Sequence, residues 1–586
     1  MGSIGNKSAK SFVIAENFDE KEYLMTMKTK GKKAVYHSKM SDSTVHVIQP
    51  SSAYARRLIC SGENIELGEK IFEKVISLQD NDPQSKTCGL WPYYLEEKLE
   101  EMDAPDKNMA GFNSREMLQV LYECADSVSK AIRDKMIDAV NAACVAIIKR
   151  NEGVQYTNVA FMESFVLCST GEITQSTEFI KKGREKLKKS LGFIWYQGSA
   201  FEHNSPCYSF LCVRDLGSIL KYIKDEESLY YAKQINDYIW SVMAEHFDYA
   251  TLQLGGPQCR AYEDFLPKGH LELIMSACGL YENFRNHPLA PKKLEHVETN
   301  AVCPEEYIPY FSGEKKWKNG RRIIMRGFNY PYFAFTQAVC HFRGDGFNLG
   351  TFNREELWNQ RRPLIAYING KESPYCFRVK CYHDGFDFSS AVLHCVQKDG
   401  NVLGNINFSS DRGDTHIGLD PVTNATIEAE DLRIMFEITG DTDNINYKTT
   451  EKHIEITVGS VPIRISNIYT RFGNFPIRIT TEKNAKNFRY SIILYSGEKR
   501  EINFAKLEEA ISVFTVEMGK FAKASKCHVI QNDKFLETEW LIDNDKLKLE
   551  TPKRAEKFKD NMYEDKQYIN GIELFRYIEE SESLEE

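Results

Sequence analysis

The sequence predicts a multi-domain α + β protein in which a helical domain is followed by an antiparallel β-sandwich. Three observations predict this fold class. Between residues 51 and 290, apolar residues recur three and four apart in runs of about 12–20 residues, as on half-buried helices. Beyond Arg321, apolar and polar residues alternate in short segments that turn residues separate. The length of 586 residues is enough for two or more domains, each with its own core.

The helical pattern begins near Ser51. The expected helices cover residues 54–59, 67–78, 117–129, a run to 149, 159–171, 177–191, 211–223, 228–247 and 271–284. Polar loops that carry Pro, Gly, Asp and Asn separate them. Because almost no β-like segment interrupts the helices, we interpret residues 51–300 as an all-α domain of antiparallel helix pairs. Residues 1–50 are polar and form an N-terminal extension in this interpretation.

The composition changes near residue 300. Prolines gather just before the change, at Pro288, Pro291, Pro304 and Pro309, and we assign residues 301–320 to a linker. Alternating segments follow, among them 376–382, 433–438 and 490–495, with turns such as Asn369-Gly370 between them. Regularly spaced short strands of this kind predict an antiparallel β-sandwich, which we place at residues 321–545. Residues 546–586 are rich in charge and are expected to form a charged C-terminal tail.

Composition and charge exclude several classes of protein. Hydrophobic residues make up 42% of the chain and charged residues 27%, as in ordinary globular proteins. The net charge of −9 argues against a broad nucleic-acid interface, which needs a basic face. No apolar run reaches the roughly 20 residues that a membrane helix needs. The first residues lack the apolar segment of a signal peptide.

The fifteen cysteines are an odd number and many of them lie on apolar faces. Together with the missing signal peptide, this pattern predicts reduced thiols in a cytoplasmic protein. Cys376, Cys381 and His383 are the closest approach to a metal-binding pattern, but no second ligand pair accompanies them. We therefore interpret them as packing residues and expect no metal or cofactor.

One short stretch, residues 201–208, concentrates chemically active side chains between two helical blocks. It contains Glu202, His203, Asn204, Ser205 and Tyr208. Pro206 disfavours a helix at Ser205, so we expect the polar side chains on an exposed loop, where catalytic groups concentrate. The structural alternative is that Asn204 or Ser205 caps the helix that follows.

Three further stretches stand out. The glycine-punctuated loop at residues 254–263 presents Arg260 and Tyr262, residues 348–363 open the β region, and residues 411–416 end in His416. Each has an ordinary structural explanation, such as a turn, a surface ion pair or a hydrogen-bonded His-Asp pair. Their occurrence together with residues 201–208 favours a functional interpretation.

A helical domain followed by a β-sandwich, with an adjacent His/Asn pair and then an Arg and a Tyr some fifty residues later, resembles the polysaccharide lyases. The similarity is to the heparinase II/III-like, alginate lyase and chondroitin lyase families, and it covers roughly residues 51–520. It implies that the helical domain is an (α/α) toroid, an incomplete α/α barrel. In several such lyases the pair is Asn-His, whereas here it is His203-Asn204, which leaves the individual roles open.

The resemblance implies β-elimination from a uronic acid, in which a base removes the C5 proton. Asn204 or Arg260 would bind the neighbouring carboxylate and stabilise the developing charge. His203, Tyr208 or Tyr262 would take the proton, and a tyrosine would return one to the leaving oxygen. We expect residues 201–208 and 254–263 to converge on one cleft of the helical domain, with His416 of the β region closing one wall. The expected partner is an acidic oligosaccharide.

The remaining substrate-binding candidates are Glu202 and the aromatic residues Trp91, Tyr93 and Trp195, which stack on sugar rings or, alternatively, belong to the core. Two other functions stay open. A glycoside hydrolase on the same scaffold would pair Glu202 with Glu263 or Asp106, because hydrolysis needs two carboxylates about 5–9.5 Å apart. A glycan-binding protein without catalysis would keep only the architecture.

Overall fold

The computed structural model describes residues 15–29, 37–327, 334–354, 359–411, 422–451, 453–557 and 565–574. The chain forms two compact units. The first unit comprises Met1–Leu191 and Asp215–Ile235, and the second comprises Gly192–Arg214 and Asn236–Glu586.

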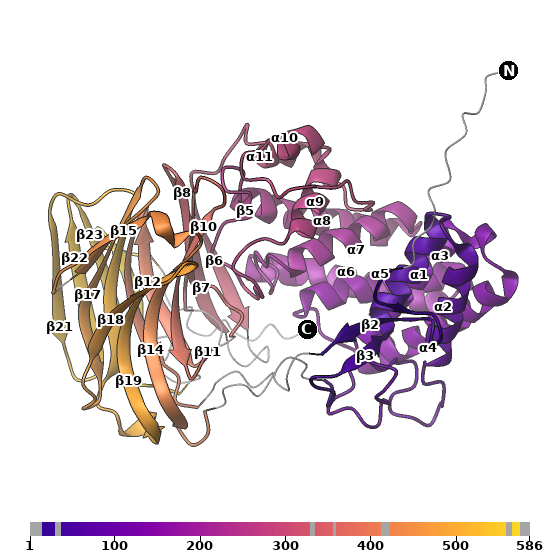
Figure 1. Ribbon diagram of the computed structural model, residues 1–586, viewed down its shortest axis with the longest axis horizontal. Helices are drawn as coiled ribbons and strands as arrows, with labels where there is room; N and C mark the ends of the chain where they lie inside the picture. Colours follow the sequence, from indigo (N-terminus) through magenta and orange to yellow (C-terminus); the bar gives the residue numbers. More distant parts are fainter. Residues whose placement is uncertain are drawn as a thin grey trace. The chain divides into compact units, whose positions relative to one another are not determined.

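The first unit consists of a small antiparallel sheet and a set of helices (Figure 1). The sheet contains β1 (Phe18–Asp19), β2 (Leu24–Lys28) and β3 (Thr44–Val47). The helices are α1 (Ile48–Cys60), α2 (Ile65–Ser77), α3 (Met109–Glu123), η1 (Ala125–Ser127), α4 (Lys130–Arg150), α5 (Thr157–Thr174) and parts of α6 (Thr177–Gln197), α7 (Tyr208–Tyr222) and α8 (Glu226–His246). The sheet lies in the segment that the sequence analysis assigned to an N-terminal extension.

Local chemistry sets the ends of these helices. The Asn64 side chain accepts a hydrogen bond from the backbone of Leu67 and so begins α2, and Ser129 begins α4 in the same way. Helix α4 ends at Asn151, which adopts a left-handed conformation that asparagine tolerates. Every residue of α5 from Thr157 to Gly171 is buried, which is typical of a helix surrounded by others.

The second unit contains three large antiparallel sheets. A nine-stranded sheet has the order β18-β19-β14-β10-β9-β8-β7-β6, with β11 paired to β10. Its strands are β6 (Asn319–Gly327), β7 (Ala334–Gly344), β8 (Phe347–Asn353), β9 (Leu364–Ile368), β10 (Tyr375–His383), β11 (Phe386–Asp387), β14 (Thr426–Thr439), β18 (Arg478–Lys483) and β19 (Asn487–Asn503).

A six-stranded sheet and a five-stranded sheet complete the set. The six-stranded sheet contains β12 (Ala391–Lys398), β13 (Asn401–Phe408), β20 (Ala510–Met518), β17 (Val461–Phe472), β16 (His453–Val458) and β15 (Ile445–Thr449). The five-stranded sheet contains β21 (Ser525–Gln531), β22 (Phe535–Ile542), β23 (Asp545–Pro552), β24 (Lys566–Ile569) and β25 (Ile572–Glu573). Shorter elements of this unit are β4 (Phe247–Asp248), β5 (Gln253–Leu254), α9 (Lys268–Cys278), α10 (Tyr281–Arg285), η2 (Glu305–Tyr307), α11 (Ile308–Phe311), η3 (Thr442–Asn444) and η4 (Phe504–Lys506).

The nine-stranded and six-stranded sheets share one apolar core. Phe436 of β14 meets Phe514 of β20 edge to face, with ring centroids 5.0 Å apart. The other face of the six-stranded sheet packs on the five-stranded sheet, where Trp540 and Leu547 join the same cluster as Leu403. The sheets therefore stack in three layers, and the six-stranded sheet is covered on both faces (Figure 1).

A buried polar cluster ties strand β24 to the nine-stranded sheet. The Asp565 carboxylate lies 2.5 Å from Nε of Arg354, accepts a hydrogen bond from Asn353 and lies 3.3 Å from Nδ1 of His394. Asp565 is almost completely buried. Its carboxylate offsets the charge of the equally buried Arg354 guanidinium, which an apolar interior alone would not tolerate.

The predicted order, helices first and antiparallel strands later, is confirmed, and the toroid stays a prediction. Three details differ. Helix α3 begins at Met109, eight residues before the predicted start. The helix predicted at 271–284 is divided at Gly279, whose φ of +68° ends α9. Strands β24 and β25 lie in the segment for which we predicted a charged tail. The domain boundaries of the sequence analysis remain predictions.

All fifteen cysteines are free thiols, as predicted. Among the described residues, no helix is long and apolar enough to cross a membrane.

Candidate active site on two adjacent loops

Two loops of the second unit meet, as the sequence predicted for residues 201–208 and 254–263. The backbone amide of Cys259 donates to the carbonyl of His203 at 3.3 Å. The Asn204 side chain donates to the carbonyls of Gly255 and Pro257 at 2.8 and 2.7 Å. These bonds join the loop before α7 to the loop after β5.

Ser205 begins helix α7 and also holds the second loop. Its hydroxyl accepts a hydrogen bond from the backbone amide of Tyr208 at 3.0 Å and donates one to the carbonyl of Arg260 at 3.0 Å. The helix cap that we considered as a structural alternative is therefore present. Tyr208, the first residue of α7, is fixed beside Arg260 as a result.

Four side chains form a connected cluster where the loops meet. The phenol oxygens of Tyr208 and Tyr262 lie 2.5 Å apart. Arg260 donates from Nη2 to the Tyr208 hydroxyl and from Nη1 to a Glu202 carboxylate oxygen, both at 3.4 Å. The guanidinium carbon lies 4.8 Å from the centroid of the Tyr208 ring, within range of a cation–π interaction. Hydrogen bonds therefore run from a buried carboxylate to a phenol at the surface.

Exposure differs sharply along this cluster. Glu202 and Arg260 are buried, with 4% and 6% of their surface exposed, whereas Tyr262 is 55% exposed. The expectation that the loop groups are exposed is thus wrong for Glu202, His203, Asn204 and Arg260. The loops pack against each other and against a sheet, so Tyr262 is the one member of the four-residue cluster that presents most of its side chain to solvent.

The electrostatic environment keeps Tyr208 protonated. Burial raises the pKa of the Tyr208 phenol well above its ordinary value, and the nearby Arg260 guanidinium offsets only part of this effect. A phenol in this state keeps its hydrogen at neutral pH and can donate it in the hydrogen bond to Tyr262, and it does not act as a base.

The nine-stranded sheet fixes the loop that carries Arg260 and Tyr262. Gln258 and Arg362 exchange backbone hydrogen bonds of 3.2 and 2.8 Å, and Ala261 donates to the carbonyl of Gln360 at 2.7 Å. The Gln360 side chain accepts a hydrogen bond from Nε of Arg260 at 3.3 Å. The guanidinium is thereby oriented from three directions, by Glu202, Tyr208 and Gln360.

A charged anchor follows in the same loop. Asp264 forms ion pairs with Arg378 of β10 and with Arg362, whose Nε lies 3.5 Å away. The Tyr367 hydroxyl donates to the carbonyl of Asp264 at 2.8 Å. Burial raises the pKa of Asp264, but the two guanidinium groups outweigh it and the pKa is lowered. The carboxylate stays ionised and holds the loop on the sheet.

Strand β8 approaches the loop so closely that it needs a glycine. A Cβ atom placed on Gly350 would lie 2.0 Å from the carbonyl carbon of Gly256, far inside van der Waals contact. Backbone therefore packs directly on backbone at this point. The stretch 348–363, which the sequence analysis singled out, thus packs through Gly350 against the loop that carries Arg260 and Tyr262.

The two remaining catalytic candidates of the loop before α7 are engaged in structure. Nδ1 of His203 lies 2.8 Å from the Ser199 hydroxyl, and its ring meets the His246 ring edge to face. Both amide hydrogens of Asn204 are directed at backbone carbonyls, and its φ of +47° is left-handed. Asn204 therefore shapes the loop, and binding a substrate carboxylate would cost it these two bonds.

Two of the three predicted aromatic residues belong to the first unit. Trp91 is fully buried in the first unit, and its indole donates to the carbonyl of Val75, so the prediction that it stacks on a sugar is wrong. Tyr93, also in the first unit, donates to Asp106 at 2.6 Å. Trp195 is 67% exposed near the end of α6. His416 lies outside the described residues.

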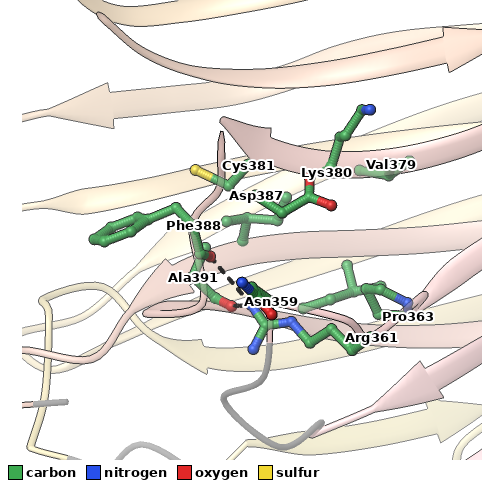
Figure 2. Close-up of a pocket in the computed structure, with 11 residues that line it drawn as sticks. Asn359, Arg361, Pro363, Val379, Lys380, Cys381, Asp387, Phe388 and Ala391 are labelled. Carbon is green, nitrogen blue, oxygen red and sulfur yellow. Dashed lines mark hydrogen bonds between the residues drawn. The ribbon is translucent and has the colours of Figure 1, made fainter. Parts of the chain in front are cut away.

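A small pocket also lies between the nine-stranded and six-stranded sheets. It lies beside Asn359 and Arg361 and is bordered by β10 and β12 (Figure 2). Arg361 donates to the carbonyls of Ser389 and Ala391. Because the Arg361 guanidinium is hydrogen-bonded to backbone carbonyls, this pocket has fewer side-chain groups suited to catalysis than the cluster around Tyr262 has.

Sequence reasoning missed the supporting residues Gln360, Asp264 and Arg378. Gln360 lies in a stretch that had been singled out, but its contact with Arg260 spans 100 residues. Neither periodicity nor spacing could indicate such a contact. Asp264 directly follows the second loop, and its position beside Tyr262 was the one available signal.

Comparison with known proteins supports the fold. A family model described as "Domain of unknown function (DUF8769)" matches residues 17–275, less than half of the chain. No curated protein matches the sequence. Heparinase III has a similar structure, with a TM-score of 0.50 and 10% sequence identity over 93% of this chain and 89% of that chain. The chain therefore has a heparinase-like, polysaccharide lyase fold.

Two further solved structures are similar at lower scores. A mutant of the heparan sulfate lyase HepC from Pedobacter heparinus has a TM-score of 0.39 and 9% identity, over 91% of this chain and 88% of that chain. A mutant of the chondroitin AC lyase from Streptomyces coelicolor has a TM-score of 0.39 and 10% identity, over 86% of this chain and 84% of that chain.

Proposed function

We propose that this protein is a glycan lyase that cleaves uronic-acid-containing oligosaccharides by β-elimination. The observation that carries the proposal is the hydrogen-bonded cluster of Arg260, Tyr208 and Tyr262, which ends in an exposed phenol. The fold shared with heparinase III supports it. The predicted cytoplasmic location belongs to the same proposal and is supported by the free thiols.

Tyr262 is the proton-transfer residue in this proposal. Its hydroxyl is accessible to a sugar and is 2.5 Å from that of Tyr208. When Tyr262 loses its proton, the Tyr208 hydroxyl donates to the phenolate oxygen, and the Arg260 charge behind Tyr208 stabilises it. The phenolate takes the C5 proton of the uronate, and the phenol so formed returns this proton to the glycosidic oxygen, which leaves C4 as the 4,5-double bond forms.

Arg260 stabilises negative charge, and Glu202 orients the Arg260 guanidinium. The guanidinium donates to a carboxylate, a phenol and an amide oxygen through three different nitrogens. This fixed orientation lets its positive charge act where the phenolate and the sugar enolate develop charge. We assign this role to Arg260 and not to Asn204, since the Asn204 amide is occupied by the backbone.

The glycoside hydrolase alternative has less support. Hydrolysis needs two carboxyl groups facing one accessible glycosidic bond. Glu202 is buried against Arg260, and Asp106 accepts the hydroxyl of Tyr93 in the first unit. A hydrolase would use Glu263, which is exposed but has no accessible partner among the residues predicted for this role.

A panel of uronate-containing oligosaccharides tests the proposal. Only a lyase produces a 4,5-unsaturated uronate, which absorbs in the ultraviolet. We expect this product with the wild-type protein and a roughly 100-fold or greater loss of turnover in Tyr262→Phe. Tyr447→Phe, at another exposed tyrosine of the second unit, is the matched control and should keep full activity. Release of saturated sugars would indicate a hydrolase, and binding without any product would indicate a glycan-binding protein.

A further inference from the structure

A second cluster of polar side chains lies in the second unit and plays no part in the proposed reaction. It consists of Glu245 and His246, at the end of helix α8, and His341 of strand β7. Each offers one possible metal-ligand atom, and the three atoms lie within 4.8 Å of one another. Both histidines are buried.

Each of the two buried imidazoles has one nitrogen without a hydrogen-bond partner among the described residues. Nδ1 of His246 lies 3.1 Å from the carbonyl oxygen of Gly256, so this nitrogen carries the hydrogen and Nε2 carries the lone pair. Nε2 of His246 and Nε2 of His341 are buried without a hydrogen-bond partner in the described part of the chain. Such buried orphan acceptors are costly unless a ligand occupies them.

The third member supplies a negative charge. Oε1 of Glu245 lies 3.5 Å from Nδ1 of His341. Its other oxygen, Oε2, accepts a hydrogen bond of 2.7 Å from Arg322, which fixes the orientation of the carboxylate. Arg343 donates to the backbone carbonyl of Glu245 at 3.2 Å and so fixes the helix end. Both arginines act on the cluster as orienting groups around ligands do.

We propose that Glu245, His246 and His341 bind one divalent transition-metal ion of the zinc type. Two imidazoles and one carboxylate, without sulfur, form a ligand set that suits Zn²⁺ or Co²⁺. Zinc holds such ligands at about 2.0–2.2 Å, which places tetrahedral ligand atoms about 3.3–3.6 Å apart, so the 4.8 Å spread must close by about 1.2–1.5 Å through side-chain rotation. A fourth, non-protein ligand such as water would complete a tetrahedron.

The ion would stabilise the loop of the candidate active site from behind. His246 contacts the carbonyl of Gly256, and the Gly256-Pro257 segment leads directly into Gln258 and Arg260. Metal binding would therefore join the end of α8, strand β7 and this loop. The proposal concerns the stability of the protein, and it holds whether or not the protein is a lyase.

Metal binding is tested on the untagged full-length protein. After treatment with EDTA, the protein is titrated with Zn²⁺ by calorimetry and with Co²⁺ by visible absorption. We expect one ion per chain, the intense visible bands of tetrahedral cobalt, and a melting temperature that rises with Zn²⁺ concentration because the ion binds the folded state. No binding of either ion by the folded wild-type protein would overturn the proposal.

Two variants locate the ion. His341→Ala and Glu245→Gln should each weaken Zn²⁺ binding at least 100-fold, whereas His383→Ala, at a buried histidine of the β-sandwich, should bind as the wild type does. Unchanged binding in Glu245→Gln and His341→Ala would place the ion elsewhere and contradict the proposal. If His341→Ala does not fold, Glu245→Gln, which keeps the side-chain shape, and X-ray absorption of the wild-type zinc complex decide. Two imidazole nitrogens in the ligand shell are expected, and a shell without them would exclude this site.

Discussion

Arg260 connects the charges of the candidate site at the scale of single residues. Its three nitrogens donate to Glu202 and Tyr208 of the loop before α7 and to Gln360, which is about 150 residues further along the chain. A planar fork can reach three acceptors at fixed angles, whereas a lysine ammonium is a single point on a flexible stem. The geometry of the guanidinium therefore matters as much as its charge.

Arg260→Lys and Arg260→Ala should both lower turnover by about 100-fold or more, since each removes oriented donors from the site. Arg260→Ala should also lower the free energy of unfolding by about 3–5 kcal/mol, because it removes the guanidinium that pairs with the buried Glu202 carboxylate. Product absorbance and denaturant unfolding measure the two effects. Arg57→Lys, at an exposed arginine, is the control and should change neither. A fully active Arg260→Lys would contradict the role of the fork.

At the scale of elements, strand β8 supports the loop that follows β5. The loop rests on the sheet through backbone contact at Gly350 and through the ion pairs of Asp264. A flexible loop would not hold Arg260 and Tyr262 at hydrogen-bonding distance from residues of another segment. The sheet therefore holds Arg260 and Tyr262 in fixed positions.

Gly350→Ala should displace this loop, because its new methyl group would overlap the backbone of Gly256. We expect a loss of at least about 1–3 kcal/mol in the free energy of unfolding, together with most of the activity. Gly192→Ala is a matched control, since Gly192 is exposed within α6 and a Cβ there meets nothing within 4 Å. That substitution should stabilise the protein by about 0.5–1 kcal/mol. Equal effects of the two substitutions would rule out the close approach as the cause.

The ionised Asp264 makes stability depend on pH in acid. Its pKa is lower in the folded protein than in the unfolded chain, so its stabilising contribution is present above the unfolded pKa, near 4, and is lost as the pH falls through the folded value. Asp264→Asn should lack this contribution at neutral pH, so its difference from the wild type should shrink as the pH drops from about 5 to about 2. Urea unfolding across this range measures the difference. A difference independent of pH would assign the effect to packing.

The helices and strands show which parts of the fold can be predicted from the sequence. The periodicity around α8 and the alternation along β10 predicted a helix and a strand, because each pattern reflects which face of that element is buried. The meeting of the two loops was also predicted, because their residue types together match the set that the resemblance to polysaccharide lyases implies. The burial of Asn204 and His203 could not be predicted, since it depends on backbone carbonyls of the second loop that carry no side-chain signal. Trp91 was assigned to a sugar site because an aromatic residue in a loop has the same sequence signal in either role.

At the scale of the whole molecule, the chain relies on packing without covalent cross-links. All fifteen cysteines are free, and ten of them are buried. Thiols in such positions are protected from solvent while the protein is folded. Large apolar cores lie between the three stacked sheets, so the β region does not need disulfides to be stable.

Thiol titration measures this directly. We expect about fifteen reactive thiols per chain after denaturation without reductant, and far fewer in the native protein, because most of the cysteines are buried. The expected order is that the partly exposed Cys88 and Cys124 react before Cys144 or Cys376. A count near zero in the denatured protein would show a disulfide framework and contradict the proposed cytoplasmic location.

The contact between Arg354 and Asp565 has a consequence for protein synthesis. The carboxylate that neutralises Arg354 is 211 residues further along the chain. At about 5–20 residues per second, the ribosome delivers Asp565 roughly 10–40 s after Arg354. Until then, Arg354, the residue that follows strand β8, cannot pair with Asp565, and its guanidinium must stay in contact with water or with a chaperone. Completion of the β region therefore waits for the synthesis of Asp565, however early its first strands emerge.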